Sequence, residues 1–153
     1  MSKKTILLAE DNADDEALTL RALRKSKLDG ETVVVRDGAE ALDYLFGMNH
    51  YAGRDTKDLP GVILLDLKLP KVDGKEVLRR LRADERTHHI PVVIFTSSRE
   101  EQDVADGFAL GCNSYVCKPV NYERFAEAVR QIASYWLGLN EIVPSAAELG
   151  KPG

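Results

Sequence analysis

Residues 6–16 read ILLAEDNADDE, a short apolar run that leads directly into five carboxylates. Four more short runs of almost wholly apolar residues follow along the chain. Together the five candidate strands are residues 5–9, 32–35, 62–65, 92–95 and 114–116. Because their hydrophobicity is nearly continuous and does not alternate, they are typical of strands buried on both faces of a parallel sheet.

Each candidate strand is followed by a segment with apolar residues at helical spacing. These residues are Leu18, Leu20, Ala22 and Leu23; Leu42, Leu45 and Phe46; Val77, Leu78 and Leu81; Val104 and Phe108; and Phe125, Val129, Ile132 and Trp136. Most strand starts recur at about the length of one βαβ unit, so right-handed crossovers predict a doubly wound α/β fold with five helices. We expect one domain over residues 1–137 and a partly disordered C-terminal extension over residues 138–153.

The composition narrows the classes of function. Lys and Arg number 21 against 25 Asp and Glu, which gives a formal charge of −4, and no stretch is strongly basic. Nucleic acid is therefore not an expected partner. No apolar run is long enough to span a bilayer, and charge interrupts the N-terminus before a signal-peptide core could form, so we expect a cytoplasmic protein without membrane contact.

Polar residues follow four of the five candidate strands. Glu10 and Asp11 end the first, Asp66 the third, Thr96 the fourth and Lys118 the fifth. The C-terminal ends of parallel strands meet at one edge of a sheet, where ligands bind in open α/β folds. Carboxylates gathered there repel one another unless a cation lies between them, and hard oxygen ligands with room for water are typical of Mg²⁺.

The remaining carboxylates of the opening stretch have a different interpretation. Asp14, Asp15 and Glu16 fall in or just before the first turn of the predicted helix. Negative charge there complements the helix dipole. We therefore interpret these three residues as capping and solvating groups.

With these motifs in order, the sequence resembles the receiver domain of two-component response regulators over about residues 5–137. The matching stretches are Glu10-Asp11, the run DLKLPKVDG at 66–74, Thr96-Ser97 and Lys118-Pro119. The resemblance implies a flavodoxin-like, five-stranded parallel sheet in the order 2-1-3-4-5. It also implies that Asp66 accepts a phosphoryl group from the phosphohistidine of a partner sensor kinase.

The resemblance assigns roles to the other site residues as well. Asp11, Asp66 and the Lys68 backbone carbonyl would bind Mg²⁺, and Glu10 would hold metal-bound water. Lys118 would supply a fixed positive charge, and the Thr96 hydroxyl would move to the new phosphoryl group. Pro119 would follow a cis peptide bond.

Two side chains keep two interpretations each. Tyr115 matches the aromatic residue that swings inward in such proteins when the threonine moves, but it also fits a half-exposed tyrosine in a short edge strand. Lys68 either screens or orients the water that attacks the phosphoaspartate, or it is a solvated lysine.

Two other classes of protein also fit parts of this pattern. A phosphatase or phosphotransferase of the haloacid-dehalogenase type would need a second aspartate two residues after Asp66, where this chain has Lys68. A flavodoxin-like carrier would need a phosphate-binding loop where Glu10 and Asp11 lie. We expect a phosphoacceptor that catalyses only its own phosphorylation and dephosphorylation.

The expected partners follow from the resemblance and from surplus apolar residues near the C-terminus. We expect a stand-alone receiver, and loop 47–61 and the C-terminal stretch resemble those of the small regulators that pair with bacterial phytochrome kinases. The C-terminal stretch adds Tyr122, Tyr135, Leu137, Leu139, Ile142 and Val143 to the stripe of the fifth helix. This surplus predicts a homodimer through the fourth helix, the fifth strand, the fifth helix and the extension. Alternatively, residues 138–144 fold back over the patch within one chain.

Overall fold

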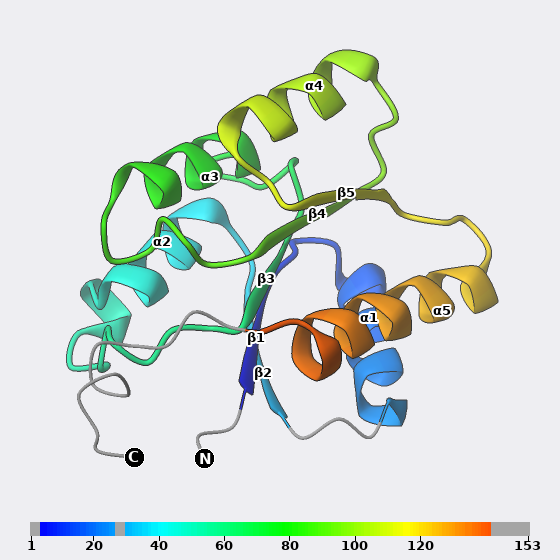
Figure 1. Cartoon of the computed structure of the whole chain (residues 1–153), viewed down its shortest axis with the longest axis horizontal. Helices are drawn as coiled ribbons and strands as arrows, with labels where there is room; N and C mark the ends of the chain where they lie inside the picture. The colour runs from blue at the N-terminus through cyan, green and yellow to red at the C-terminus, as the bar shows by residue number, and fades with distance from the viewer. Residues whose placement is uncertain (1–3, 27–29, 142–153) are drawn as a thin grey trace.

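The computed structural model describes residues 4–26 and 30–141. Strands and helices alternate along the chain, and the five strands form one parallel sheet in the order β2-β1-β3-β4-β5 (Figure 1). The elements are β1 (Lys4–Ala9), α1 (Ala13–Lys25), β2 (Gly30–Val35), α2 (Gly38–Phe46), the 3₁₀ turn η1 (Asn49–Tyr51), β3 (Val62–Leu65), α3 (Gly74–Ala83), β4 (Val92–Thr96), α4 (Glu101–Leu110), β5 (Ser114–Cys117), α5 (Tyr122–Ala133) and the π-helical η2 (Ser134–Leu139). The predicted fold and strand order are confirmed.

Helices cover both faces of the sheet (Figure 1). On one face α2 and α3 pack against residues such as Leu7 and Ile94, and α4 lies beside α3. On the other face α1 and α5 pack against Leu8 and Phe95. Burial on both faces explains the continuous apolar runs of β3 and β4, whereas the edge strand β5 is only half-buried. Within the described ranges, no helix is long and apolar enough to cross a membrane.

The predicted apolar stripe of α4 is wrong at Phe108, whose side chain is 53% exposed. The residue of α4 that is buried is Gly107, beside Ile94 and Tyr115. A Cβ at Gly107 would lie 2.8 Å from the Ile94 Cδ1 atom, so α4 approaches the sheet through a position without a side chain. A hydrophobic pattern cannot register a glycine contact, because glycine contributes no apolar side chain.

The long connection at residues 47–61 is organised around one arginine. The Arg54 guanidinium donates hydrogen bonds to the backbone carbonyls of Tyr44, Leu45, Asp55 and Asp58, and it lies 4.1 Å from the centroid of the Tyr44 ring. These contacts join the connection to the end of α2.

Helical structure continues beyond α5 through η2 to Leu139. Leu137 is buried against the core shared by α1 and α5, and its carbonyl accepts a hydrogen bond from the Lys4 ammonium at 2.5 Å. Leu139, in contrast, is 75% exposed. The predicted disorder of the extension falls on residues 142–153, outside the described residues.

Candidate functional site

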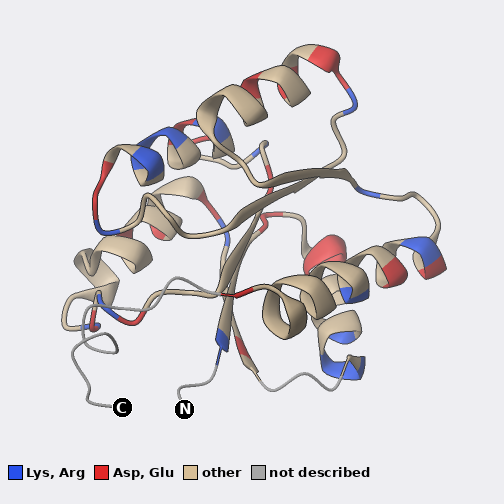
Figure 2. Ribbon diagram, viewed as in Figure 1, with Lys and Arg blue, Asp and Glu red and all other residues tan. Residues whose placement is uncertain are grey.

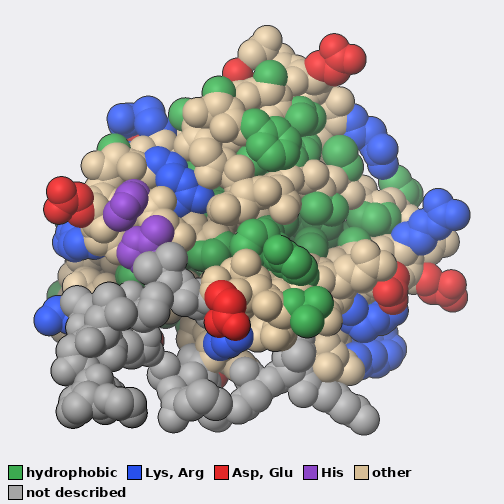
Figure 3. Space-filling view, viewed as in Figure 1, with side chains coloured by type: hydrophobic (Ala, Val, Ile, Leu, Met, Phe, Trp, Pro, Cys, Tyr) green, Lys and Arg blue, Asp and Glu red, His purple; other side chains and the backbone are tan. Residues whose placement is uncertain are grey.

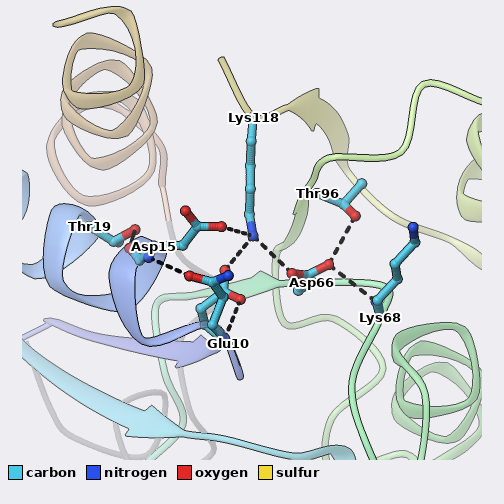
Figure 4. A network of polar contacts seen from close by, with 8 residues as sticks. Glu10, Asp15, Thr19, Asp66, Lys68, Thr96 and Lys118 are labelled. Atoms are coloured by element: carbon cyan, nitrogen blue, oxygen red, sulfur yellow. Dashed lines mark hydrogen bonds and ion pairs between the residues drawn. The ribbon is translucent and has the colours of Figure 1, made fainter. Parts of the chain in front are cut away.

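The site lies at the C-terminal edge of the sheet, where β1, β3, β4 and β5 end. Parallel register brings Glu10, Asp66, Thr96 and Lys118 to this edge although they come from four separate parts of the chain (Figure 4). All four side chains are buried. Strand pairing therefore assembles the four strand-end residues that the sequence predicted.

Lys118 contacts three carboxylates of the site. Its ammonium nitrogen, Nζ, lies 2.6 Å from Glu10 Oε1, 2.8 Å from Asp15 Oδ2 and 2.9 Å from Asp66 Oδ2 (Figure 4). The Lys118 side chain is only 5% exposed, so these ion pairs are screened little by water.

Both oxygens of Asp66 are held by donors. Oδ2 accepts from Lys118, while Oδ1 accepts from the Thr96 hydroxyl at 2.9 Å and from the Lys68 backbone N–H at 3.1 Å. The Asp66 backbone N–H also donates to the Ala9 carbonyl, which joins the end of β3 to the end of β1. The carboxylate is thus fixed in one orientation.

The loop after Asp66 is fixed by the start of α3. Gly74 N–H donates to the Leu67 carbonyl, and a Cβ at Gly74 would overlap the Asp66 carbonyl oxygen and lie 2.7 Å from Leu67 Cα. Only glycine fits at this contact. The start of α3 therefore supports the backbone that carries the Asp66 carboxylate.

The buried charges shift one another's pKa values. Burial raises the pKa of Glu10 to about 7, although its bond to Lys118 opposes this shift. Burial would also raise the pKa of Asp66, but the hydrogen bonds from Lys118, Lys68 and Thr96 outweigh it and lower that pKa below its ordinary value. Burial would lower the pKa of Lys118, yet hydrogen bonds to Asp15, Glu10 and Asp66 raise it. Lys118 is therefore a fixed cation at neutral pH.

Glu10, Asp11 and Asp66 form an acidic cluster in which one oxygen from each lies within 4.8 Å of the others. Glu10 and Asp66 are buried, and Asp11 is exposed. A set of carboxylate oxygens open to water on one side fits a hard divalent cation that keeps part of its water shell. The carboxylates present therefore fit a hard divalent cation such as Mg²⁺ or Mn²⁺.

The interpretation of Asp15 as only a capping or solvating group is wrong. Figure 2 shows acidic residues at the start of α1 and basic residues at its end, as the helix dipole favours. However, Asn12 is the residue that caps α1, and the Asp15 carboxylate turns into the site to pair with Lys118.

Tyr115 is half-buried in β5, and its hydroxyl donates to the Ser98 carbonyl at 3.0 Å. The side chain therefore reaches the loop between β4 and α4, two residues after Thr96. The prediction of a cis bond before Pro119 is wrong, because that bond is trans. A trans bond already brings Lys118 Nζ within 3 Å of three carboxylates, and trans is also the intrinsically preferred form before proline.

The residues at this edge of the sheet belong to a known protein family. A family model for the response regulator receiver domain matches residues 6–130. The chain belongs to this family. Receivers are signalling phosphoacceptors, which separates this chain from the haloacid-dehalogenase enzymes and the flavodoxin-like carriers.

Two relatives match this receiver over most of their length. The probable methanogenesis regulatory protein FilR2 of Methanothrix harundinacea is 42% identical over 135 residues, which are 88% of this chain and 84% of FilR2. Response regulator Rcp1 of Synechocystis sp. is 38% identical over 134 residues, which are 88% of this chain and 89% of Rcp1.

Solved structures agree with the sequence comparison. The Mn²⁺-bound form of Rcp1 has a TM-score of 0.86 at 36% identity and covers 92% of this receiver and 99% of its own chain. The phosphorylated cyanobacterial phytochrome response regulator RcpA has a TM-score of 0.87 at 38% identity and covers 94% of this receiver and 100% of its own chain.

Proposed function

We propose that Asp66 accepts a phosphoryl group from the phosphohistidine of a sensor kinase in a Mg²⁺-dependent reaction. The observation that carries this proposal is the environment of the Asp66 carboxylate, which faces Lys118 and Thr96 beside the acidic cluster. A carboxylate oxygen attacks phosphorus, the new P–O bond forms as the P–N bond breaks, and the imidazole nitrogen keeps the electron pair. Hydrolysis later returns the carboxylate and releases inorganic phosphate.

The neighbouring residues supply positioning and charge, which is most of what phosphoryl transfer requires of a protein. Lys118 and the Thr96 hydroxyl bind phosphoryl oxygens. Asp11, Asp66 and the Lys68 carbonyl would hold Mg²⁺, with Glu10 beside its water ligands, and the bound cation would supply positive charge near the transferring group. Tyr115 follows Thr96 inward, since its hydroxyl is already bonded to the same loop.

Labelling with acetyl phosphate and Mg²⁺ tests whether Asp66 is the phosphoacceptor. Intact-mass measurement should find one added phosphoryl group on the wild type and none on Asp66→Asn. Asp73→Asn is the matched control, because Asp73 is an exposed aspartate that caps α3 and lies outside the site. Equal labelling of Asp66→Asn and the wild type would refute the assignment.

We propose that the partner kinase is a phytochrome and that the two proteins meet in the cytoplasm. RcpA is named as a phytochrome response regulator, and it matches this receiver over all of its own length. Phosphotransfer from a purified, autophosphorylated bacterial phytochrome should be complete within minutes, and a matched non-phytochrome kinase should transfer more slowly. Equal rates would leave a sensor kinase of another kind.

The second proposed partner is another copy of this chain. Hydrophobic side chains gather on the face formed by α4, β5 and α5 (Figure 3). Phe108 in α4 is 53% exposed, and Tyr135 and Leu139 in η2 are 49% and 75% exposed. An exposed apolar patch of this kind is typical of an interface.

Sedimentation equilibrium of the full chain tests self-association. A dimer should form at tens of micromolar, and Phe108→Glu should weaken it by about tenfold. Met48→Glu should not weaken it, because Met48 is also 53% exposed but lies beyond the end of α2. If the wild type stays monomeric with and without a phosphoryl mimic, the patch serves the kinase or is covered within one chain.

A further inference from the structure

We propose that Asp15 is a positioning residue that holds the Lys118 ammonium beside Asp66 and thereby sets how fast Asp66 is phosphorylated. The inference rests on the proposed function, because it assigns a role in that reaction. It concerns a residue outside the acidic cluster and outside the set of strand-end residues.

Lys118 is surrounded by carboxylates. An ammonium group has three N–H donors, and Lys118 has three carboxylate partners within 2.9 Å. The contacts to Asp15 and Asp66 are hydrogen bonds, and the contact to Glu10 is an ion pair. A phosphoryl oxygen that binds Lys118 must therefore compete with these three carboxylates.

Two of the three carboxylate partners of Lys118 take part in the proposed chemistry. Asp66 becomes the phosphoaspartate and no longer offers a charged carboxylate. Glu10 belongs to the acidic cluster that fits a divalent cation, so cation binding competes with Lys118 for its oxygens. Asp15 is the partner that neither process removes.

The backbone of Asp15 is held by two hydrogen bonds. Its backbone N–H donates to the Asn12 side chain at 2.9 Å, and its carbonyl accepts from the hydroxyl of Thr19 at 2.7 Å (Figure 4). Thr19 is buried at 1% exposure. The short Asp15 side chain therefore starts from a fixed point in the first turn of α1, whereas the lysine that it holds has a long flexible chain.

The neighbouring acidic residues of α1 do not share this role. Glu16 pairs with Arg36 on the surface at 2.9 Å. The Asp14 side chain is exposed and makes no hydrogen bond or ion pair among the described residues. Asp14 thus supplies a control that changes the net charge by the same amount, one residue away and without contact to Lys118.

The test compares Asp15→Ala and Asp15→Asn with Asp14→Ala and Asp14→Asn in the full chain, with acetyl phosphate and Mg²⁺. Asp15→Ala should be phosphorylated about tenfold more slowly than Asp14→Ala, as expected for the loss of one charge-assisted hydrogen bond. Asp15→Asn should recover part of the rate relative to Asp15→Ala, because its amide oxygen still accepts from Lys118.

A second measurement reports on the lysine itself. Beryllofluoride is a stable phosphoryl mimic, and ¹⁹F spectra of the bound form resolve fluorines in different surroundings. Asp15→Ala should shift the fluorine that faces Lys118 and leave the others in place, an effect that a purely structural role for Asp15 would not produce. Asp14→Ala should give the wild-type spectrum.

The outcomes separate this inference from the proposed function. If the wild type takes up no phosphoryl group, the proposed function fails. If the wild type is phosphorylated but the Asp15 and Asp14 variants have equal rates and equal ¹⁹F spectra, only the role of Asp15 is refuted.

Discussion

Replacing Lys118 with methionine should destabilise the receiver in the absence of divalent cations. The substitution keeps the length of the side chain and removes the charge that pairs with Glu10, Asp15 and Asp66. Glu10 and Asp66 have side-chain exposures of only 2% and 9%, so water cannot replace the lost partner.

The structure sets the magnitude. Removing one member of a buried ion pair costs about 3–5 kcal/mol, because a charge stays buried without a partner. Here the loss should lie near the lower limit, since Asp66 keeps its bonds from Thr96 and Lys68 and Glu10 keeps one from the Asn12 N–H. A loss of about 3 kcal/mol corresponds to a fall of about 10 °C in Tm for a chain of this size.

The pH dependence has a definite sign. Without Lys118, burial raises the pKa of Glu10 further above its unfolded value, and Asp66 loses the strongest of the contacts that lower its pKa. Both carboxyls therefore bind protons more tightly in the folded variant than in the folded wild type. A carboxyl of this kind destabilises the fold at high pH, and the penalty disappears as the pH falls towards the unfolded pKa. The stability difference between wild type and variant should therefore be largest near pH 8 and should shrink towards pH 5.

Urea denaturation followed by circular dichroism, with a chelator present, measures this difference. Lys71→Met is the control, because Lys71 is 70% exposed and lies 3.6 Å from Asp37, so its loss should cost less than about 0.5 kcal/mol. Millimolar Mg²⁺ should reduce the loss in free energy of unfolding that Lys118→Met causes. Equal stability of the two variants at pH 8, or a deficit that grows as the pH falls, would refute the account of Lys118 as the charge that balances the site.

Three further predictions concern the surroundings of the site. Gly74→Ala should destabilise the fold by at least about 2 kcal/mol in urea and slow phosphorylation, because the added Cβ displaces the backbone that carries Asp66; wild-type values would contradict this contact. Lys68→Ala should hydrolyse its phosphoaspartate about twofold faster if the exposed cation screens attacking water, and an unchanged half-life would leave Lys68 with only its backbone contacts. The pKa of Glu76 should be about 2 by NMR titration, since Arg79 and Arg80 donate hydrogen bonds to its carboxylate. These pairs stabilise the fold above pH 4.5, and the stabilisation is lost as the pH falls through 2.

Much of the site could be predicted because it follows from strand ends. Glu10, Asp66, Thr96 and Lys118 each lie at the end of an apolar run, and a parallel sheet brings such positions to one edge. Asp15 could not be assigned in the same way, because acidic residues in a first helical turn have a general reason to be there. Which of three adjacent carboxylates turns into the site depends on the rotation of α1 against the sheet, and that rotation is a result of packing.

The sequence by itself determined the doubly wound sheet, the order of its elements and the edge where the chemistry lies, because these depend on local periodicity and on the short connections between neighbouring elements. Only the tertiary structure decided that Gly107 and not Phe108 meets the sheet, that the bond before Pro119 is trans, and that Lys118 has three carboxylate partners. These features depend on distances between segments far apart in the chain. Such distances are set by the shape and packing of side chains, which no local pattern of residues encodes.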